Sequence, residues 1–248
     1  MNSKIKGTIC GVFAAISYGM NPLGALNLYQ EGLNVNSVIF YRYGLATTIL
    51  ALIMLAQKKS FAITRREFAV LSVLGVLMVV SSLTLFGSFN FMDAGIASTL
   101  LFVYPVMVAV MMAIFFKEKV TSITVISIAL ALGGISLLYK GGDGATLSTV
   151  GVLLVMASSL TYAVYIIVVN KSALIMSSVK LTFYVLLIGT VILIAYSFVG
   201  EDTRIQPLTT VSGGYLIFEI QESSVRAMTR VAPPQSELYI LAGNTLLY

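Results

Sequence analysis

Two tyrosines are the residues of this chain best placed to bind a small molecule. Tyr18 follows Gly7 by eleven residues, which puts it about 16 Å along a helix that starts at Gly7. Tyr162 has the same setting, because Ser159–Tyr162 repeats the small, apolar, hydroxyl, tyrosine pattern of Ala15–Tyr18. Tyrosine hydroxyls form hydrogen bonds and tyrosine rings attract cations. The pair predicts the lining of a binding cavity, and packing against a neighbouring helix is the alternative.

Four more polar side chains in apolar segments are candidates for substrate contact, namely Asn21, Arg42, Asn90 and Tyr104. Asn21 precedes Pro22, and proline frees a backbone carbonyl, so this position predicts a substrate contact, a hinge or a kink. Arg42 could bind an anionic group, or its guanidinium could reach the lipid headgroups. Tyr104 adjoins a proline, and Asn90 lies at the end of its apolar segment.

Residues for other kinds of chemistry are missing from the sequence. The chain has no histidine and one cysteine, Cys10. This excludes histidine-dependent catalysis, histidine zinc sites and an intramolecular disulfide. The apolar segments hold no aspartate or glutamate, so a buried proton carrier and a pair of intramembrane catalytic aspartates have no candidates. We therefore expect no enzymatic activity, no metal and no cofactor.

The composition indicates a membrane protein. Hydrophobic residues make up 58% of the 248 residues, charged residues 10%, and the mean hydropathy is +0.96. Soluble domains contain about 25% charged residues. The net charge is +5, and most of the basic residues lie in short loops between apolar segments. These features exclude a soluble enzyme, a disordered chain and a nucleic-acid binder, and they make the lipid bilayer the expected partner.

Seven apolar segments are long enough to cross a bilayer, for which a helix needs about 20 residues. Their short linkers make consecutive helices antiparallel neighbours. The sequence therefore predicts an all-α, polytopic membrane helix bundle. The predicted spans are residues 7–28, 37–56, 68–90, 94–116, 120–139, 149–169 and 181–199.

Lysine and arginine are distributed unevenly between the two ends of these spans. Ten of them fall on one side and three on the other, and the sides alternate through all seven spans. Because cytoplasmic loops are enriched in lysine and arginine, we expect a cytoplasmic amino terminus in a plasma (bacterial inner) membrane. The ten are Lys4, Lys6, Lys58, Lys59, Arg65, Arg66, Lys117, Lys119, Lys171 and Lys180.

The chain also resembles itself at an offset of 143–144 residues. Phe40-Tyr41 meets Phe183-Tyr184 at 143, and Thr47 meets Thr190 in the same register. The repeating unit contains five spans. Because five is an odd number, the second copy starts on the opposite side of the membrane and must be inverted. Inverted repeats are typical of transporters. We expect residues 1–140 to form the first five-helix repeat and 141–200 the first two helices of the second.

The last segment, residues 201–248, does not continue this pattern. It carries four charges within a dozen residues, each of which would cost about 2.5–3.5 kcal/mol at the centre of a membrane helix. We expect a non-spanning polar tail, produced by a frame shift near Gly213 or by truncation with an unrelated tail. The four charges belong to Glu219, Glu222, Arg226 and Arg230.

Between Lys6 and Val199 the chain resembles the EamA-type carriers of the drug/metabolite transporter superfamily. The resemblance rests on Asp93–Leu100, on Val103-Tyr104-Pro105 and on Phe116–Thr121. In the family pattern these are a small-residue start of the fourth span, a proline in mid-span, and a glutamate thirteen residues later. The resemblance implies ten helices in two inverted halves that move small metabolites, amino acids or drugs.

The sequence therefore predicts carrier-type transport of a small metabolite, amino acid or drug-like solute by alternating access. The alternative is a non-transporting remnant of such a carrier from a disrupted gene. A selective channel is disfavoured, because no filter-like glycine run or charged ring is present. The expected partners are the bilayer and a small-molecule substrate, without nucleic acid, and a homodimer is compatible with this interpretation.

Overall fold

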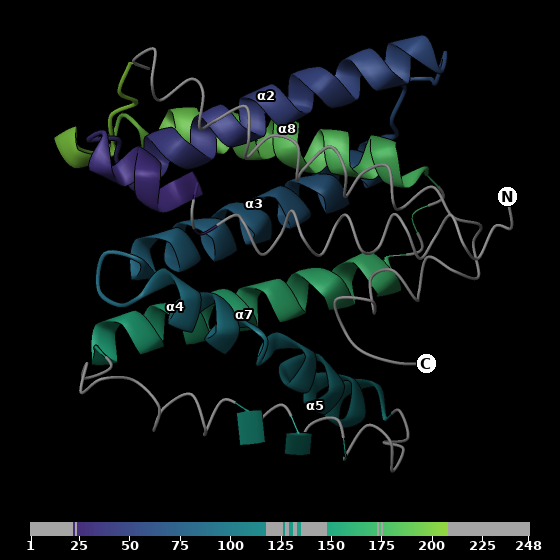
Figure 1. The fold of residues 1–248 in the computed structure, drawn as a ribbon. Helices are drawn as coiled ribbons and strands as arrows, with labels where there is room; N and C mark the ends of the chain where they lie inside the picture. The colour runs from purple at the N-terminus through teal and green to yellow at the C-terminus, as the bar shows by residue number, and fades with distance from the viewer. Residues whose placement is uncertain are drawn as a thin grey trace, which may run out of the picture. The chain divides into compact units, whose positions relative to one another are not determined.

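The computed structural model describes residues 22, 24–117, 126, 129–130, 133–134, 148–172, 174 and 176–207. These residues form helices and connecting turns, with no strand among them (Figure 1). The helices are α2 (Val35–Ala56), α3 (Arg65–Ser88), α4 (Ala94–Leu101), α5 (Tyr104–Phe116), α7 (Thr149–Lys171), α8 (Ser178–Tyr196) and the 3-10 helix η1 (Glu201–Thr203).

Five helical segments of the described residues are long and apolar enough to cross a membrane. Four are α2, α3, α7 and α8, and the fifth is Ala94–Phe116, which contains both α4 and α5. Their outward faces expose large apolar side chains, among them Phe115 at 73% and Leu153 at 64%. Helices that are apolar on every face belong in lipid. The chain is therefore an integral membrane protein with an all-α, polytopic helix bundle.

These five segments confirm five of the seven predicted spans. The predicted spans 7–28 and 120–139 lie largely outside the described residues, as does the predicted tail beyond residue 207. Three of the five confirmed spans were predicted to start two or three residues too late, because α2 begins at Val35, α3 at Arg65 and α8 at Ser178. The start of α3 shows the reason. The Thr64 amide donates to the Glu67 carboxylate at 2.7 Å and the Glu67 amide donates to the Thr64 hydroxyl at 3.2 Å. This capping box starts the helix before its apolar run.

The chain divides into two compact units. The first unit contains α2, α8, η1 and residues 65–79 of α3. The second contains residues 80–88 of α3 together with α4, α5 and α7. Within the first unit α2 packs on α8, and within the second α7 packs on both α4 and α5.

In the first unit, α2 and α8 lie side by side and antiparallel (Figure 1). The start of α2 contacts the segment that follows α8, where the Asn34 amide group donates to the Arg204 carbonyl at 2.7 Å. The start of α8 contacts the segment that follows α2, where the Tyr184 hydroxyl donates to the Phe61 carbonyl. The amino-terminal end of each helix is thus hydrogen-bonded to the segment that follows the other helix.

The N-caps and most of the buried positions of the two helices correspond at the offset of 143. Asn34 caps α2 by accepting from the Ser37 amide at 2.8 Å, and Ser177 caps α8 by accepting from the Lys180 amide at 3.4 Å. Six of the seven buried positions of α8 have a buried counterpart in α2. The pairs are Asn36 and Val179, Val38 and Leu181, Arg42 and Val185, Tyr43 and Leu186, Ala46 and Gly189, and Leu50 and Leu193.

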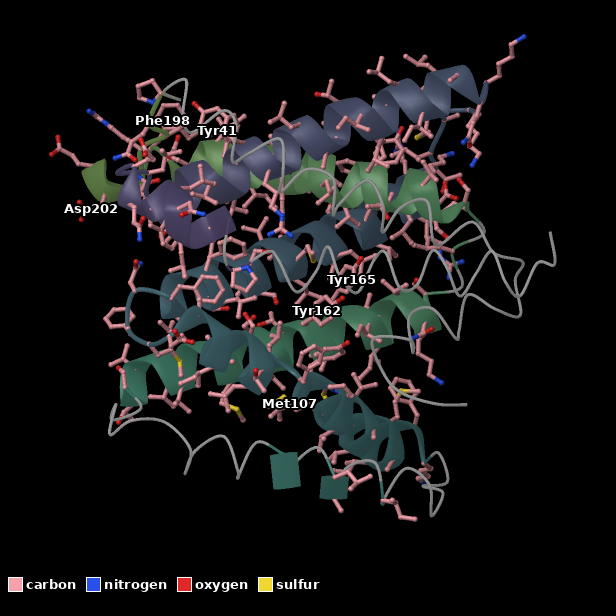
Figure 2. All side chains as sticks on the ribbon, viewed as in Figure 1. Tyr41, Met107, Tyr162, Tyr165, Phe198 and Asp202 are labelled. Atoms are coloured by element: carbon pink, nitrogen blue, oxygen red, sulfur yellow. The ribbon has the colours of Figure 1, made fainter. Side chains whose placement is uncertain are left out.

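Two hydrogen bonds at opposite ends of this helix pair are also counterparts, and we call them the tyrosine ties. In one, the Tyr41 hydroxyl donates to the Gln206 carbonyl at 2.8 Å (Figure 2 labels Tyr41). In the other, the Tyr184 hydroxyl donates to the Phe61 carbonyl. Each tyrosine also meets the ring of the preceding phenylalanine edge-on, with centroids 5.2 Å and 5.0 Å apart. The repeated Phe-Tyr dipeptide therefore performs the same structural task twice.

Candidate functional site

The second unit contains an interruption at the middle of a membrane span, between α4 and α5 (Figure 1). Pro105 has no N–H, so the Leu101 carbonyl four residues earlier receives no helical hydrogen bond from it. Phe102 and Val103 instead form tight turn bonds to Thr99 and Leu100, each 3.1 Å long. The freed Leu101 carbonyl accepts a hydrogen bond from the buried Ser159 hydroxyl of α7, at 3.2 Å. This contact joins the interruption to α7.

The loss of stability caused by removing the Ser159 hydroxyl is expected to depend on Pro105. Ser159→Ala leaves the Leu101 carbonyl without its donor and should cost about 0.6–1.7 kcal/mol of unfolding free energy, the range for hydrogen bonds between membrane helices. Pro105→Ala supplies an N–H to the same carbonyl, so Ser159→Ala should cost less in that background. A double-mutant cycle of unfolding in mixed micelles measures the difference. An equal cost in both backgrounds would show that Ser159 does not replace the missing donor.

Three tyrosines adjoin this interruption, and we call them the tyrosine cluster. Tyr104 begins α5, and its ring meets Tyr162 of α7 edge-on with centroids 4.9 Å apart. Tyr162 is nearly parallel to Tyr165, at 5.7 Å and 10° (Figure 2). Tyr104 is 2% exposed and Tyr165 is 4% exposed, whereas Tyr162 is half-buried. Within the part of the chain that the structure describes, the Tyr162 hydroxyl has no hydrogen-bond partner.

The cluster lies near the middle of its two spans. Tyr162 is thirteen residues into α7, about 20 Å from the amino-terminal end and 14 Å from the other. Tyr104 is ten residues beyond Ala94, about 15 Å along its span. At this depth water is scarce, so polar groups there are costly and are often functional. At mid-membrane depth, the α4–α5 interruption is therefore accompanied by aromatic rings and by a hydroxyl, that of Tyr162, with no partner among the described residues.

Serine hydroxyls fix the packing around α7. Ser158 donates to the Ser81 carbonyl of α3 at 2.7 Å, and Ser81 donates to the Ser158 carbonyl at 3.1 Å. Their exposures are 0% and 6%. Small hydroxyl residues allow close approach of helices in membranes. The adjacent serines Ser158 and Ser159 thus bind α7 to two different neighbours, which fixes the position from which Tyr162 projects.

The two described segments that carry the cluster offer a ligand no acidic side chain. Neither α7 nor the Ala94–Phe116 span contains an aspartate or glutamate. The Lys171 ammonium lies 4.6 Å from the centroid of the Phe116 ring, nine residues beyond Tyr162 at the end of α7. No group of three metal-ligating side chains occurs among the described residues. The chemistry available at the cluster is aromatic contact and hydrogen bonding.

The six candidate site residues from the sequence fall in different places. Tyr104 and Tyr162 come together in the cluster. Arg42 is in α2 of the first unit and is buried, with 9% exposure. Asn90 lies in the exposed turn after α3. Tyr18 and Asn21 lie outside the described residues, so the predicted pairing of Tyr18 with Tyr162 stays a prediction.

Two residues of the site were missed in the sequence. Tyr165 follows Tyr162 by three residues, a spacing that puts two side chains on the same helix face, and this was an available signal. Ser159 was not foreseen as the donor to the Leu101 carbonyl. Pro105 indicates that this carbonyl is freed, but only the packing of α7 on α4 identifies its new partner.

Comparisons with known proteins agree with this architecture. The chain is 25% identical over 201 residues to the uncharacterized transporter YvbV of Bacillus subtilis (strain 168). The match includes 80% of this chain, which spans 65% of the length of that relative. A crystal structure of a protein shares the fold with a TM-score of 0.62 and 14% identity, over 98% of this chain and 90% of that one. The model of the EamA-like transporter family matches residues 5–140. The chain therefore belongs to the EamA-like transporter family.

Proposed function

We propose that this chain carries out secondary, carrier-type transport of a small metabolite, amino acid or drug-like solute across the plasma (bacterial inner) membrane by alternating access. Family membership and five apolar helices of membrane-spanning length support movement of a solute through the bilayer. We also propose a cytoplasmic amino terminus, from the ten-to-three distribution of lysine and arginine.

The observation that carries the proposal is the correspondence between α2 and α8. Antiparallel packing of two helices that match at a constant offset is the arrangement expected of inverted repeats. In transporters of this type the substrate site lies near the bilayer midplane and uses interrupted helices. We accordingly assign residues 1–140 to the first repeat and 141–200 to the start of the second.

The proposed substrate site is the tyrosine cluster, and Tyr162 is its central residue. Its ring contacts both other tyrosines, and its hydroxyl is unpartnered among the described residues. The interruption beside Tyr104 supports this assignment, because irregular backbone at membrane depth is tolerated where it is buried in protein or lines a cavity. Arg42 is a separate candidate contact in the first unit.

Counterflow into proteoliposomes tests the transport function. The chain would be reconstituted and assayed with a panel of labelled amino acids, nucleobases and aromatic amides. We expect protein-dependent counterflow of at least one of them, and a loss of about tenfold or more in Tyr162→Leu, because about 1.4 kcal/mol of binding energy corresponds to a factor of ten. The matched control is Phe115→Leu, at a 73% exposed ring on the adjoining span. Counterflow equal to that of empty vesicles across the panel would contradict transport, and unchanged counterflow in Tyr162→Leu would remove Tyr162 from the site.

A further inference from the structure

We propose that the tyrosine cluster binds an uncharged planar ring that bears a hydrogen-bonding group. The inference rests on the transport function proposed above and names the class of solute. Its basis is the juxtaposition of three stacked or edge-on rings with a hydroxyl that has no hydrogen-bond partner among the described residues, on two segments, α7 and Ala94–Phe116, that contain no carboxylate.

The ring geometry favours a planar partner. Tyr104 and Tyr165 are almost completely buried, so packing holds their rings in place. Tyr162 is half-buried and its ring contacts both of them, so part of its side chain remains accessible. Aromatic rings associate in offset-stacked or edge-on arrangements, and the cluster already contains both. A planar solute ring extends this arrangement, and its polar substituent can pair with the Tyr162 hydroxyl, which both donates and accepts.

The charges of the described residues on α7 and on the Ala94–Phe116 span favour a neutral solute over a charged one. A cation would find ring faces but no carboxylate on the two described segments that carry the cluster, because neither α7 nor the Ala94–Phe116 span contains an acidic residue. An anion would find Lys171 nine residues away along α7, already placed over the Phe116 ring. An uncompensated charge at mid-membrane depth costs more than contact with an aromatic face returns. An uncharged ring avoids this cost.

Three indoles that differ only in charge provide the test. Indole-3-acetamide is neutral, tryptamine is a cation and indole-3-acetate is an anion at pH 7, and all carry the same ring. Binding to the reconstituted 248-residue chain would be measured by equilibrium dialysis. Indole fluorescence reports the ligand alone, since the protein has no tryptophan. We expect the amide to bind about tenfold more tightly than either charged indole, which corresponds to about 1.4 kcal/mol.

Variants of Tyr162 separate the ring from the hydroxyl. Tyr162→Phe should weaken binding of the amide about three- to tenfold through loss of one hydrogen bond. Tyr162→Leu should weaken it further, and Phe115→Leu should leave it unchanged. Equal or tighter binding of tryptamine or indole-3-acetate, or full binding by Tyr162→Leu, would overturn the inference. Should a variant fail to fold, competition among the three indoles on the unsubstituted chain decides the question.

The two proposals fail in distinguishable ways, because dialysis needs no transport. Tyr162-dependent binding of the amide without counterflow would contradict transport and leave the assigned solute class standing. Counterflow of other solutes by a chain that does not bind the amide would support transport and overturn the solute class.

Discussion

Gly189→Ala is expected to destabilise the helix pair of the first unit by about 1–3 kcal/mol, the usual cost of overpacking. A Cβ atom at Gly189 would lie 2.9 Å from two ring carbons of Tyr43 and 3.2 Å from a methyl group of Val79. Tyr43 is buried and its hydroxyl donates to the Met78 carbonyl at 3.3 Å, so its ring cannot move away freely. Glycine at this position is what lets α8 approach α2.

The same substitution at Gly44 should have the opposite sign. Gly44 is in α2, and a Cβ atom there would have no described neighbour within 4 Å. Alanine in a helix is favoured over glycine by about 0.5–1 kcal/mol, so Gly44→Ala should stabilise. Thermal or denaturant unfolding in detergent measures both variants. Equal effects of the two substitutions would show that α8 does not approach α2 closely at Gly189.

Removal of either tyrosine tie should destabilise the first unit, and the two losses of unfolding free energy should be similar. Tyr41→Phe and Tyr184→Phe each delete a hydrogen bond to a backbone carbonyl, which contributes about 0.5–1.5 kcal/mol. Because the ties are at opposite ends of the helix pair, the double variant should lose about the sum of the two.

Tyr196→Phe is the matched control, because Tyr196 is 38% exposed at the end of α8 and makes no hydrogen bond through its hydroxyl to the described residues. Its unfolding free energy should equal that of the unsubstituted chain. A large loss in only one of the two tie variants would contradict the view that Tyr41 and Tyr184 are counterparts.

Most of the fold follows from the sequence because a bilayer imposes simple requirements. An apolar run of about 20 residues must be helical in lipid, since every backbone polar group needs a partner. Five predicted spans were confirmed on this basis. The helix starts were harder to predict, because they depend on single capping side chains such as Thr64, Asn34 and Ser177.

The candidate site was only partly accessible from the sequence. Tyr104 and Tyr162 were identified from a proline neighbour and from the internal repeat, and the structure brings them together. Tyr165 and Ser159 depend on the rotation of α7 against α4 and α5, and nearly uniform hydrophobicity conceals that rotation. In a soluble helix the polar face would have revealed it.

The central claim is that α2 and α8 cross the membrane in opposite directions as parts of inverted repeats. The most direct test is to find on which side of the membrane the segment after α2 and the segment after α8 lie. In a Cys10→Ser background, single cysteines would be introduced as Ser60→Cys, after α2, and as Asp202→Cys, after α8, both at exposed positions. A membrane-impermeant maleimide should label position 202 in intact bacterial cells and position 60 only after permeabilisation. Labelling of both positions from the same side of the membrane would contradict the inverted arrangement.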